Sequence, residues 1–297
     1  MLIKKMEKLP KISIPKHYNY IACFLTLQCN YNCDYCINYF SPSGQMPDKL
    51  IPGREWTAAL NRLEAREDLP VTLQGGEPGL HPDFIRIINN IKPQLHIDIL
   101  TNLSFDVDAF IKKVNPKRLS RRAPYANIRA TYHPRHMKLD EALTRVLKLQ
   151  QAHFSIGLYG IAHPAIEREI KLAQDKCAKL GIDFRIKDFL GEHEGKMYGT
   201  YRYPEAAGNT LAGRCLCRTH ELIVGPGAEV FRCHHYLYES IDCAGNLLEA
   251  GFKINDDFTQ CTHFGKCNPC DIKIKTNRFQ IHGYTAVEIK EIEDNGE

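Results

Sequence analysis

Three cysteines stand close together in the stretch Cys29-Asn30-Tyr31-Asn32-Cys33-Asp34-Tyr35-Cys36, directly after an apolar run at 21–27. The run predicts a strand, so the cysteines lie on the loop that leaves it. Their C-x3-C-x2-C spacing lets three thiolates reach one metal centre. A structural zinc site has four protein ligands, whereas a [4Fe–4S] cluster bound by three cysteines keeps one iron free for an outside ligand. The spacing therefore favours a cluster with an open iron.

A second motif, Gln74-Gly75-Gly76-Glu77-Pro78, follows the predicted strand at 71–73. Paired glycines let the backbone approach a ligand closely. The carboxylate beside them can accept hydrogen bonds from an ammonium group. A simple Gly-Pro turn between a strand and a helix is the alternative interpretation.

With both motifs in place, the chain resembles the radical S-adenosylmethionine (SAM) superfamily. That family binds its [4Fe–4S] cluster through C-x3-C-x2-C with an aromatic residue before the last cysteine, which here is Tyr35. The resemblance implies that the open iron binds the amino and carboxylate groups of SAM, and that a GGEP motif contacts the SAM amino group. On this basis the cluster ligands are Cys29, Cys33 and Cys36, and the expected SAM contacts include Tyr35, Gly75, Gly76, Glu77 and Pro78.

The hydrophobic pattern between residues 20 and 189 alternates short strands with helices. We expect strands at 21–27, 71–73, 96–101, 128–131, 154–159 and 183–187, and helices at 54–66, 82–91, 107–114, 139–151 and 165–180. Strands joined by helical crossovers imply a parallel α/β sheet. Six strands are too few for a full eight-fold barrel, so the pattern predicts an open, partial (β/α)6 barrel. Ligands should gather at the carboxyl ends of its strands.

Three polar residues follow or lie on the next strands. Asn102 ends the third strand, Arg129 lies on the fourth, and His133 follows it. The resemblance implies that side chains here contact SAM or the substrate, and an arginine suits a carboxylate. Capping of the backbone, or a solvated arginine, explains these residues as well.

The remaining composition bounds the class of protein. The chain has 297 residues, twelve cysteines and a net charge of +4. So many cysteines in a reducing cytoplasm suggest metal ligands rather than disulfides, and the cytoplasm is the expected location. No membrane span or signal peptide is expected, and the charge gives little reason to expect nucleic acid. We expect an N-terminal extension at 1–19, the barrel at 20–190, a linker at 191–213 and a second domain at 214–297 that ends in a charged tail.

A second cysteine group lies in that last domain. A β-hairpin is expected from strands at 221–224 and 229–232, with a cysteine near each end, and a C-x2-C turn follows downstream. Four of these thiolates, Cys215, Cys233, Cys267 and Cys270, can meet at one zinc or iron–sulfur centre. Cys217 can replace Cys215, and Cys261 can substitute in the second pair.

The spacings in this group resemble the auxiliary-cluster module of radical SAM enzymes, called twitch in its short form and SPASM when complete. The twitch form has C-x17-C followed by C-x2-C, as Cys215 to Cys233 and Cys267 to Cys270 have here. The module usually has a glycine where this chain has Ala228. The resemblance implies a second, auxiliary [4Fe–4S] cluster in a small domain of β-hairpin and helix.

The function expected from these resemblances is radical SAM catalysis. The cluster would cleave SAM to a 5′-deoxyadenosyl radical that abstracts a substrate hydrogen, and the auxiliary cluster would help to oxidise a small-molecule intermediate. The expected partners are that substrate and a flavodoxin- or ferredoxin-type reductant. The alternative within the family is a maturase that modifies a ribosomally made peptide. From another class, a cysteine-rich zinc or iron–sulfur binding module without catalysis is the competing hypothesis.

Overall fold

The computed structural model describes residues 9–38, 50–208, 213–276 and 282–291. Within these residues the main sheet has nine strands. Their spatial order is β14 (Gly245–Asn246), β13 (Glu229–Phe231), β12 (Glu221–Val224), β2 (Tyr20–Thr26), β4 (Val71–Gly75), β5 (Ile97–Thr101), β6 (Ile128–Thr131), β7 (Ile156–Ala162) and β8 (Phe184–Asp188).

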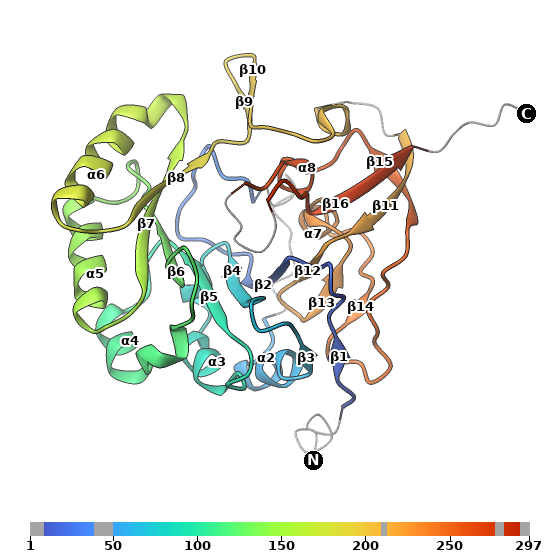
Figure 1. Cartoon of the computed structure of the whole chain (residues 1–297), viewed down its shortest axis with the longest axis horizontal. Helices are drawn as coiled ribbons and strands as arrows, with labels where there is room; N and C mark the ends of the chain where they lie inside the picture. Colours follow the sequence, from blue (N-terminus) through green and yellow to red (C-terminus); the bar gives the residue numbers. More distant parts are fainter. Residues whose placement is uncertain (1–8, 39–49, 209–212, 277–281, 292–297) are drawn as a thin grey trace, which may run out of the picture.

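The α/β fold predicted from the sequence is confirmed. Every strand from β12 to β8 pairs in parallel with its neighbour, and the six predicted strands begin within two residues of their expected starts. The crossover helices lie on the outer side of the curved sheet (Figure 1). They are α2 (Gly53–Leu60), α3 (Phe84–Asn90), α4 (Val107–Lys113), α5 (Leu139–Gln151) and α6 (Glu167–Lys179).

One predicted helix is too long. The helix expected at 54–66 ends at Leu60, because β3 (Leu63–Glu64) pairs instead with β1 (Ile12–Ser13). This parallel pair ties the described part of the N-terminal extension to the barrel, since Leu63 and Ile12 are both buried in the main core.

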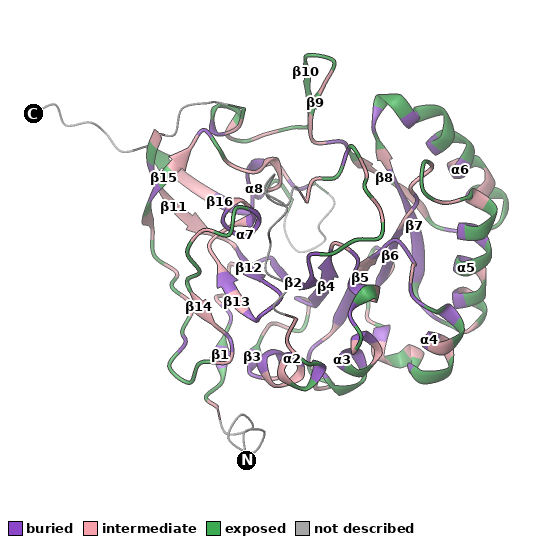
Figure 2. Ribbon diagram, turned by 180° about the vertical axis from the view of Figure 1, so that it is seen from behind, coloured by how far each residue is buried: buried purple, intermediate pink, exposed green. Residues whose placement is uncertain are grey.

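The two faces of the strands carry different side chains, as strand alternation requires. On β2, Ile21, Cys23 and Leu25 belong to the core shared with the helices. The other face of β2, with Tyr20 and Phe24, packs instead against α7 (His234–Tyr238). In Figure 2 most of the barrel strands are buried, and the crossover helices are exposed on their outer faces. The C-terminal part of the chain therefore covers the inner face of β2.

The C-terminal elements hold two findings that the sequence did not predict. The expected hairpin forms as β12 and β13, but β12 also pairs with β2, so it extends the barrel sheet. The expected charged tail is instead partly a strand, β16 (Val287–Glu291), which joins β11 (Gly213–Thr219) and β15 (Thr259–Phe264) in a three-stranded antiparallel sheet of the described residues. Residues 292–297 lie outside the described part.

The segment expected as a linker has structure of its own. It contains a hairpin of β9 (Gly191–His193) and β10 (Lys196–Tyr198), followed by the 3-10 turn η4 (Pro204–Ala206). Among the described residues, none of the helices is long and apolar enough to cross a membrane.

Candidate functional site

The three-cysteine loop leaves the carboxyl end of β2, where the neighbouring strands also end. Cys29 and Cys36 are exposed and Cys33 is half-buried. The backbone of this loop is bonded to the Gly-Gly-Glu segment after β4: the Gly76 N–H donates to the Thr26 carbonyl at 3.0 Å, and the Glu77 N–H donates to the Gln28 carbonyl at 2.8 Å. The two motifs found in the sequence are thus held side by side.

The paired glycines permit this contact between the two loops. A Cβ on Gly75 would lie 2.1 Å from the Thr26 carbonyl oxygen, and one on Gly76 would lie 2.2 Å from that of Gln28. Both distances are far below any real Cβ contact, so the backbones approach this closely only because side chains are absent. Pro78 begins the 3-10 turn η1 (Pro78–Leu80) that follows.

Glu77 is almost fully buried, and its carboxylate is bonded to the protein. It accepts hydrogen bonds from the Thr101 hydroxyl at 2.7 Å, the Asn102 N–H at 2.6 Å and the Gly79 N–H at 2.9 Å. Burial raises the pKa of Glu77, while these donors act in the opposite direction. A carboxylate has about four acceptor sites, so one more donor can still be accepted.

Asn102 extends the same network to the cysteine loop. Its side-chain amide donates to Asn30 Oδ1 at 3.0 Å and lies 3.8 Å from Cys29 Sγ. Asn30 in turn donates to the Ser104 hydroxyl at 2.8 Å. The predicted site residue at the end of β5 therefore reaches the predicted cluster ligands.

Tyr35 and His133 also meet at this edge of the sheet. The Tyr35 hydroxyl lies 3.1 Å from His133 Nδ1, Cys33 Sγ lies 3.4 Å from the same atom, and the two rings stack. Burial, together with the charges of His136 and Lys187, lowers the pKa of His133 to about 4. His133 is therefore neutral at physiological pH.

Arg129 lies deeper on the inner face of the sheet. Its guanidinium Nη2 is 3.4 Å from Asp98 Oδ2, and Arg121 Nη2 is 2.8 Å from the same oxygen. The Arg129 side chain is 8% exposed. Within the described part of the chain its Nε has no hydrogen-bond partner. Asp98 thus occupies one edge of the guanidinium, and Nε is buried among protein atoms.

The three N-terminal thiols suit a cluster by their chemistry. Burial, with the charges of Cys36 and Cys29, raises the pKa of Cys33 to about 12, and only a metal would hold such a thiol as thiolate. Among the described residues, no three histidine, cysteine or carboxylate side chains are arranged around a single ion. A [4Fe–4S] cluster gives each thiolate its own iron, so its ligands stand farther apart than the ligands of one ion do.

The C-terminal cysteines gather around the three-stranded sheet. Cys215 on β11 is directly opposite Cys261 on β15, and Cys217 shares their face by strand alternation. Cys233 ends the hairpin at the start of α7, and Cys267 precedes α8 (Pro269–Ile272). The Cys215 thiol hydrogen-bonds to Cys261, which lowers the pKa of Cys261 and raises that of Cys215.

An apolar cavity of about 150 Å³ lies beside these thiols. Cys217, Cys233 and Cys261 open into it. Most of its remaining wall is apolar, with Val230, Phe252 and other side chains of that kind. We refer to it below as the thiol cavity.

Several functional candidates were missed by the sequence reasoning. His234 Nδ1 lies 2.8 Å from Asp271 Oδ1, and both side chains are buried. Cys270, a ligand that the sequence did predict, precedes Asp271 and lies near Tyr238 and His234. The Tyr238 hydroxyl donates to Asn38 Oδ1 at 2.6 Å, and Asn38 donates to the Gly75 carbonyl at 2.8 Å. These contacts connect the two cysteine regions, and no local sequence signal indicates them.

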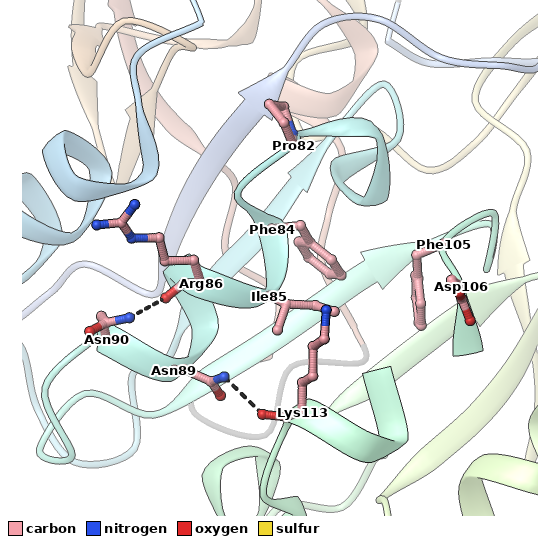
Figure 3. A pocket seen from close by; sticks show the side chains of 9 residues that line it. All are labelled: Pro82, Phe84, Ile85, Arg86, Asn89, Asn90, Phe105, Asp106 and Lys113. Atoms are coloured by element: carbon pink, nitrogen blue, oxygen red, sulfur yellow. Dashed lines mark hydrogen bonds between the residues drawn. The ribbon is translucent and has the colours of Figure 1, made fainter. Parts of the chain in front are cut away.

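A larger surface pocket lies elsewhere. It measures about 620 Å³ between α3 and α4 and is lined by residues such as Phe84, Arg86 and Lys113 (Figure 3). None of its nine lining residues is a cysteine or another predicted site residue. The candidate site is therefore the carboxyl edge of the sheet and not this pocket.

Known proteins resemble parts of this chain. No family model matches it. A segment of 92 residues, 29% of this chain and 26% of the relative, is 33% identical to the GTP 3′,8-cyclase of Actinobacillus succinogenes. A segment of 94 residues, 30% of this chain and 16% of the relative, is 33% identical to molybdenum cofactor biosynthesis protein 1 of Drosophila melanogaster. The chain thus matches about a quarter or less of these curated relatives.

The fold has a solved counterpart. The structure of native anSMEcpe with bound AdoMet and the Kp18Cys peptide aligns with a TM-score of 0.50 and 12% identity, over 81% of this chain and 78% of that one. This likeness shows a shared fold. Together, the local sequence matches and the fold support the resemblance to the radical SAM superfamily.

Proposed function

We propose that this protein is a radical SAM enzyme. The observation that carries the proposal is the contact between the two motifs: the backbone of the cysteine loop is bonded to Gly76 and Glu77, and Asn102 joins both. These hydrogen bonds fix the positions of the three cysteines. Fixed positions are useful for ligands that must reach one metal cluster, and a loop without a metal would gain little from them. The cluster and SAM, when bound, would supply the 5′-deoxyadenosyl radical that abstracts a substrate hydrogen.

The residues of this chain would then bind the cluster and SAM and orient them. Cys29, Cys33 and Cys36 would hold the cluster, and the Gly75–Glu77 backbone would face the amino group of SAM. Tyr35 and His133 would form an uncharged wall beside the cluster, since the low pKa of His133 keeps a positive charge away from it. Arg129 would reach an acceptor atom of a bound molecule only after its buried Nε becomes accessible.

The finer part of the proposal concerns the C-terminal cysteines. We assign them to an auxiliary [4Fe–4S] cluster that takes an electron from the substrate radical, so that a small molecule is oxidised. What supports this assignment is the gathering of thiols around a mostly apolar cavity beside β12 and β13. The twitch or SPASM module, the cytoplasmic location, the flavodoxin- or ferredoxin-type reductant and the peptide-modifying alternative remain predictions.

The test is anaerobic reconstitution with iron and sulfide, followed by an iron count and an assay for 5′-deoxyadenosine with SAM and dithionite. We expect roughly eight irons per chain for two [4Fe–4S] clusters, with deoxyadenosine formed. The triple variant C29A/C33A/C36A should lose roughly four irons and all deoxyadenosine. The variant C243A, which removes an exposed cysteine outside both predicted ligand sets, is the matched control. Bound zinc without SAM cleavage would leave only the non-catalytic metal-binding module.

A further inference from the structure

Two cysteines lie directly opposite each other in the three-stranded C-terminal sheet. Cys215 on β11 is paired with Cys261 on β15 in antiparallel register. Both side chains are buried in the same small core, which they form with Tyr236. In the strand pairings of the described residues, no other cysteine is opposite a second one. The strand register therefore singles out this pair among the thiols of the chain.

This register suits a disulfide bond. Directly opposite residues of an antiparallel pair have Cα atoms about 4.5–5.5 Å apart, and disulfides join residues whose Cα atoms are about 4.4–6.8 Å apart. Opposite side chains also lie on the same face of the sheet, so the sulfurs of Cys215 and Cys261 can join without a large movement of the backbone. Cys217 has no such partner, because Thr259 is opposite it.

The thiol cavity gives one of the two sulfurs access to a small molecule. Cys261 lines this cavity of about 150 Å³, whereas Cys215 does not. A water molecule occupies about 30 Å³, so a molecule as small as hydrogen peroxide can be accommodated. The exposed fractions agree with this difference, since Cys261 is 8% exposed and Cys215 is 2% exposed. An oxidant that enters the cavity therefore meets Cys261 first.

The surroundings of Cys261 suit a negatively charged sulfur, which is the form that reacts with peroxide. The His263 N–H donates to Cys261 Sγ at 3.4 Å. Arg232 Nη1 donates to the Gln260 carbonyl at 3.0 Å, and the Arg232 guanidinium carbon lies 5.3 Å from the centre of the Tyr236 ring. An N–H donor and a nearby guanidinium both stabilise negative charge on sulfur.

We propose that Cys261 and Cys215 form a peroxide-responsive dithiol. The Cys261 thiolate attacks one oxygen of hydrogen peroxide, the O–O bond breaks, and the leaving hydroxide takes up a proton to become water. The sulfur of Cys215 then attacks the sulfenic acid of Cys261, which forms the S–S bond and releases the second oxygen as water. In total the peroxide accepts two electrons and two protons, and the two thiols become one disulfide.

The disulfide closes a loop over residues 216–260, which contain the β12–β13 hairpin and α7. Because α7 covers the inner face of β2, the bond ties that cover to the C-terminal sheet. In the cytoplasm, the expected location, disulfides are usually transient and redox-sensing. The inference goes beyond the proposed function and meets it at one point: Cys215 is an expected cluster ligand, and a sulfur held in a disulfide cannot bind iron.

The experiment maps oxidised thiols in the full chain after a chelator has removed bound iron. The protein is treated with hydrogen peroxide, its free thiols are alkylated with iodoacetamide, and its peptides are analysed by mass spectrometry. We expect Cys215 and Cys261 to escape alkylation together, in one disulfide-linked pair of peptides, and dithiothreitol to restore both thiols. The control C217S removes a thiol that lines the same cavity and should leave this disulfide unchanged.

Two further variants test the order of attack. In C215S, Cys261 should accumulate as a sulfenic acid that dimedone traps, whereas dimedone should not label Cys215 in C261S. Thermal unfolding before oxidation shows that each variant is folded, and the disulfide map of the wild type needs no variant. Disulfides spread over other cysteines without preference, or Cys261 oxidised in urea and not in the native protein, would overturn the proposal. None of these results depends on SAM cleavage, so the 5′-deoxyadenosine assay tests the proposed function separately.

Discussion

The backbone N–H of Asn102 donates a hydrogen bond of 2.6 Å to the carboxylate of Glu77. This bond joins the end of β5 to the loop after β4, and two further donors complete the network around the carboxylate. A glutamine at position 77 would bring its amide hydrogens against one of these donors. We expect Glu77→Gln to lower the free energy of unfolding by about 1–3 kcal/mol and to reduce iron at the N-terminal site. Urea unfolding and iron counts check this, with Glu141→Gln on exposed α5 as the control. Unchanged values for both would show that the network is dispensable.

Gly76 is expected to tolerate no side chain. Its Cβ would lie 2.2 Å from the Gln28 carbonyl oxygen, so Gly76→Ala must push the two loops apart. We expect a loss of about 1–3 kcal/mol in unfolding free energy and a reconstituted cluster with weakened SAM binding. Gly251→Ala is the matched control, because a Cβ at Gly251 meets nothing within 4 Å. SAM binding is measured by calorimetry. Equal affinity in both variants would contradict the expectation that position 76 must lack a side chain.

Glu221 and Lys275 form an ion pair whose side chains are 0% and 4% exposed. Replacing only the cation leaves a buried carboxylate without its counter-charge, which typically costs 3–5 kcal/mol. We therefore expect Lys275→Met to destabilise the protein by about that amount. The double variant E221L/K275M should regain much of it, because no charge then remains in the interior. A double variant no more stable than K275M in chemical denaturation would argue against this reasoning.

The buried ring of His81 should make stability depend on pH. The Asp83 N–H donates to its Nδ1 and its Nε2–H donates to the Ile51 carbonyl, which fixes the neutral form. Burial lowers the pKa of His81 from its usual 6.5. Below pH 6.5 the unfolded chain therefore binds a proton here that the folded chain does not, so the free energy of unfolding falls as the pH drops.

His81→Gln removes that proton and should flatten the fall in stability below pH 6.5, although it costs about 1 kcal/mol above this pH through lost hydrogen bonds. Urea unfolding on both sides of that pH provides the measurement. The exposed His153 serves as the control through H153N, which should keep the wild-type slope. If the unfolding free energy of H81Q and of the wild type fell equally with decreasing pH, His81 would not be the cause of the pH dependence.

The barrel strands were predictable because each carries its own apolar signal. Every predicted strand starts within two residues of an observed one. Strand β2 is almost entirely apolar, and strands such as β6 and β8 alternate apolar with polar residues. Strand β16 was equally readable: Val287 and Ile289 alternate with Glu288 and Lys290. The charged residues suggested a tail, but alternation is what a half-buried strand requires.

The site was predictable only in part. The three-cysteine motif and the Gly-Gly-Glu-Pro motif can be recognised in the sequence by their spacing. They lie side by side because they follow adjacent parallel strands. The bond from Tyr238 to Asn38 spans 200 positions of sequence, and no local pattern encodes such a contact. Arg129 was expected to contact SAM or the substrate, yet its pairing with Asp98 depends on the register Leu100↔Arg129 between β5 and β6. Register between separate strands is decided by tertiary packing.

The parallel pairing of β12 with β2 has a consequence for how the protein is made. Residues 221–224 must bond to residues 20–23, so during synthesis the first barrel strand keeps one open edge until about three quarters of the 297 residues have left the ribosome. An open apolar strand edge is a template for aggregation. Truncation before β12 should therefore yield insoluble protein even though all six barrel units are present.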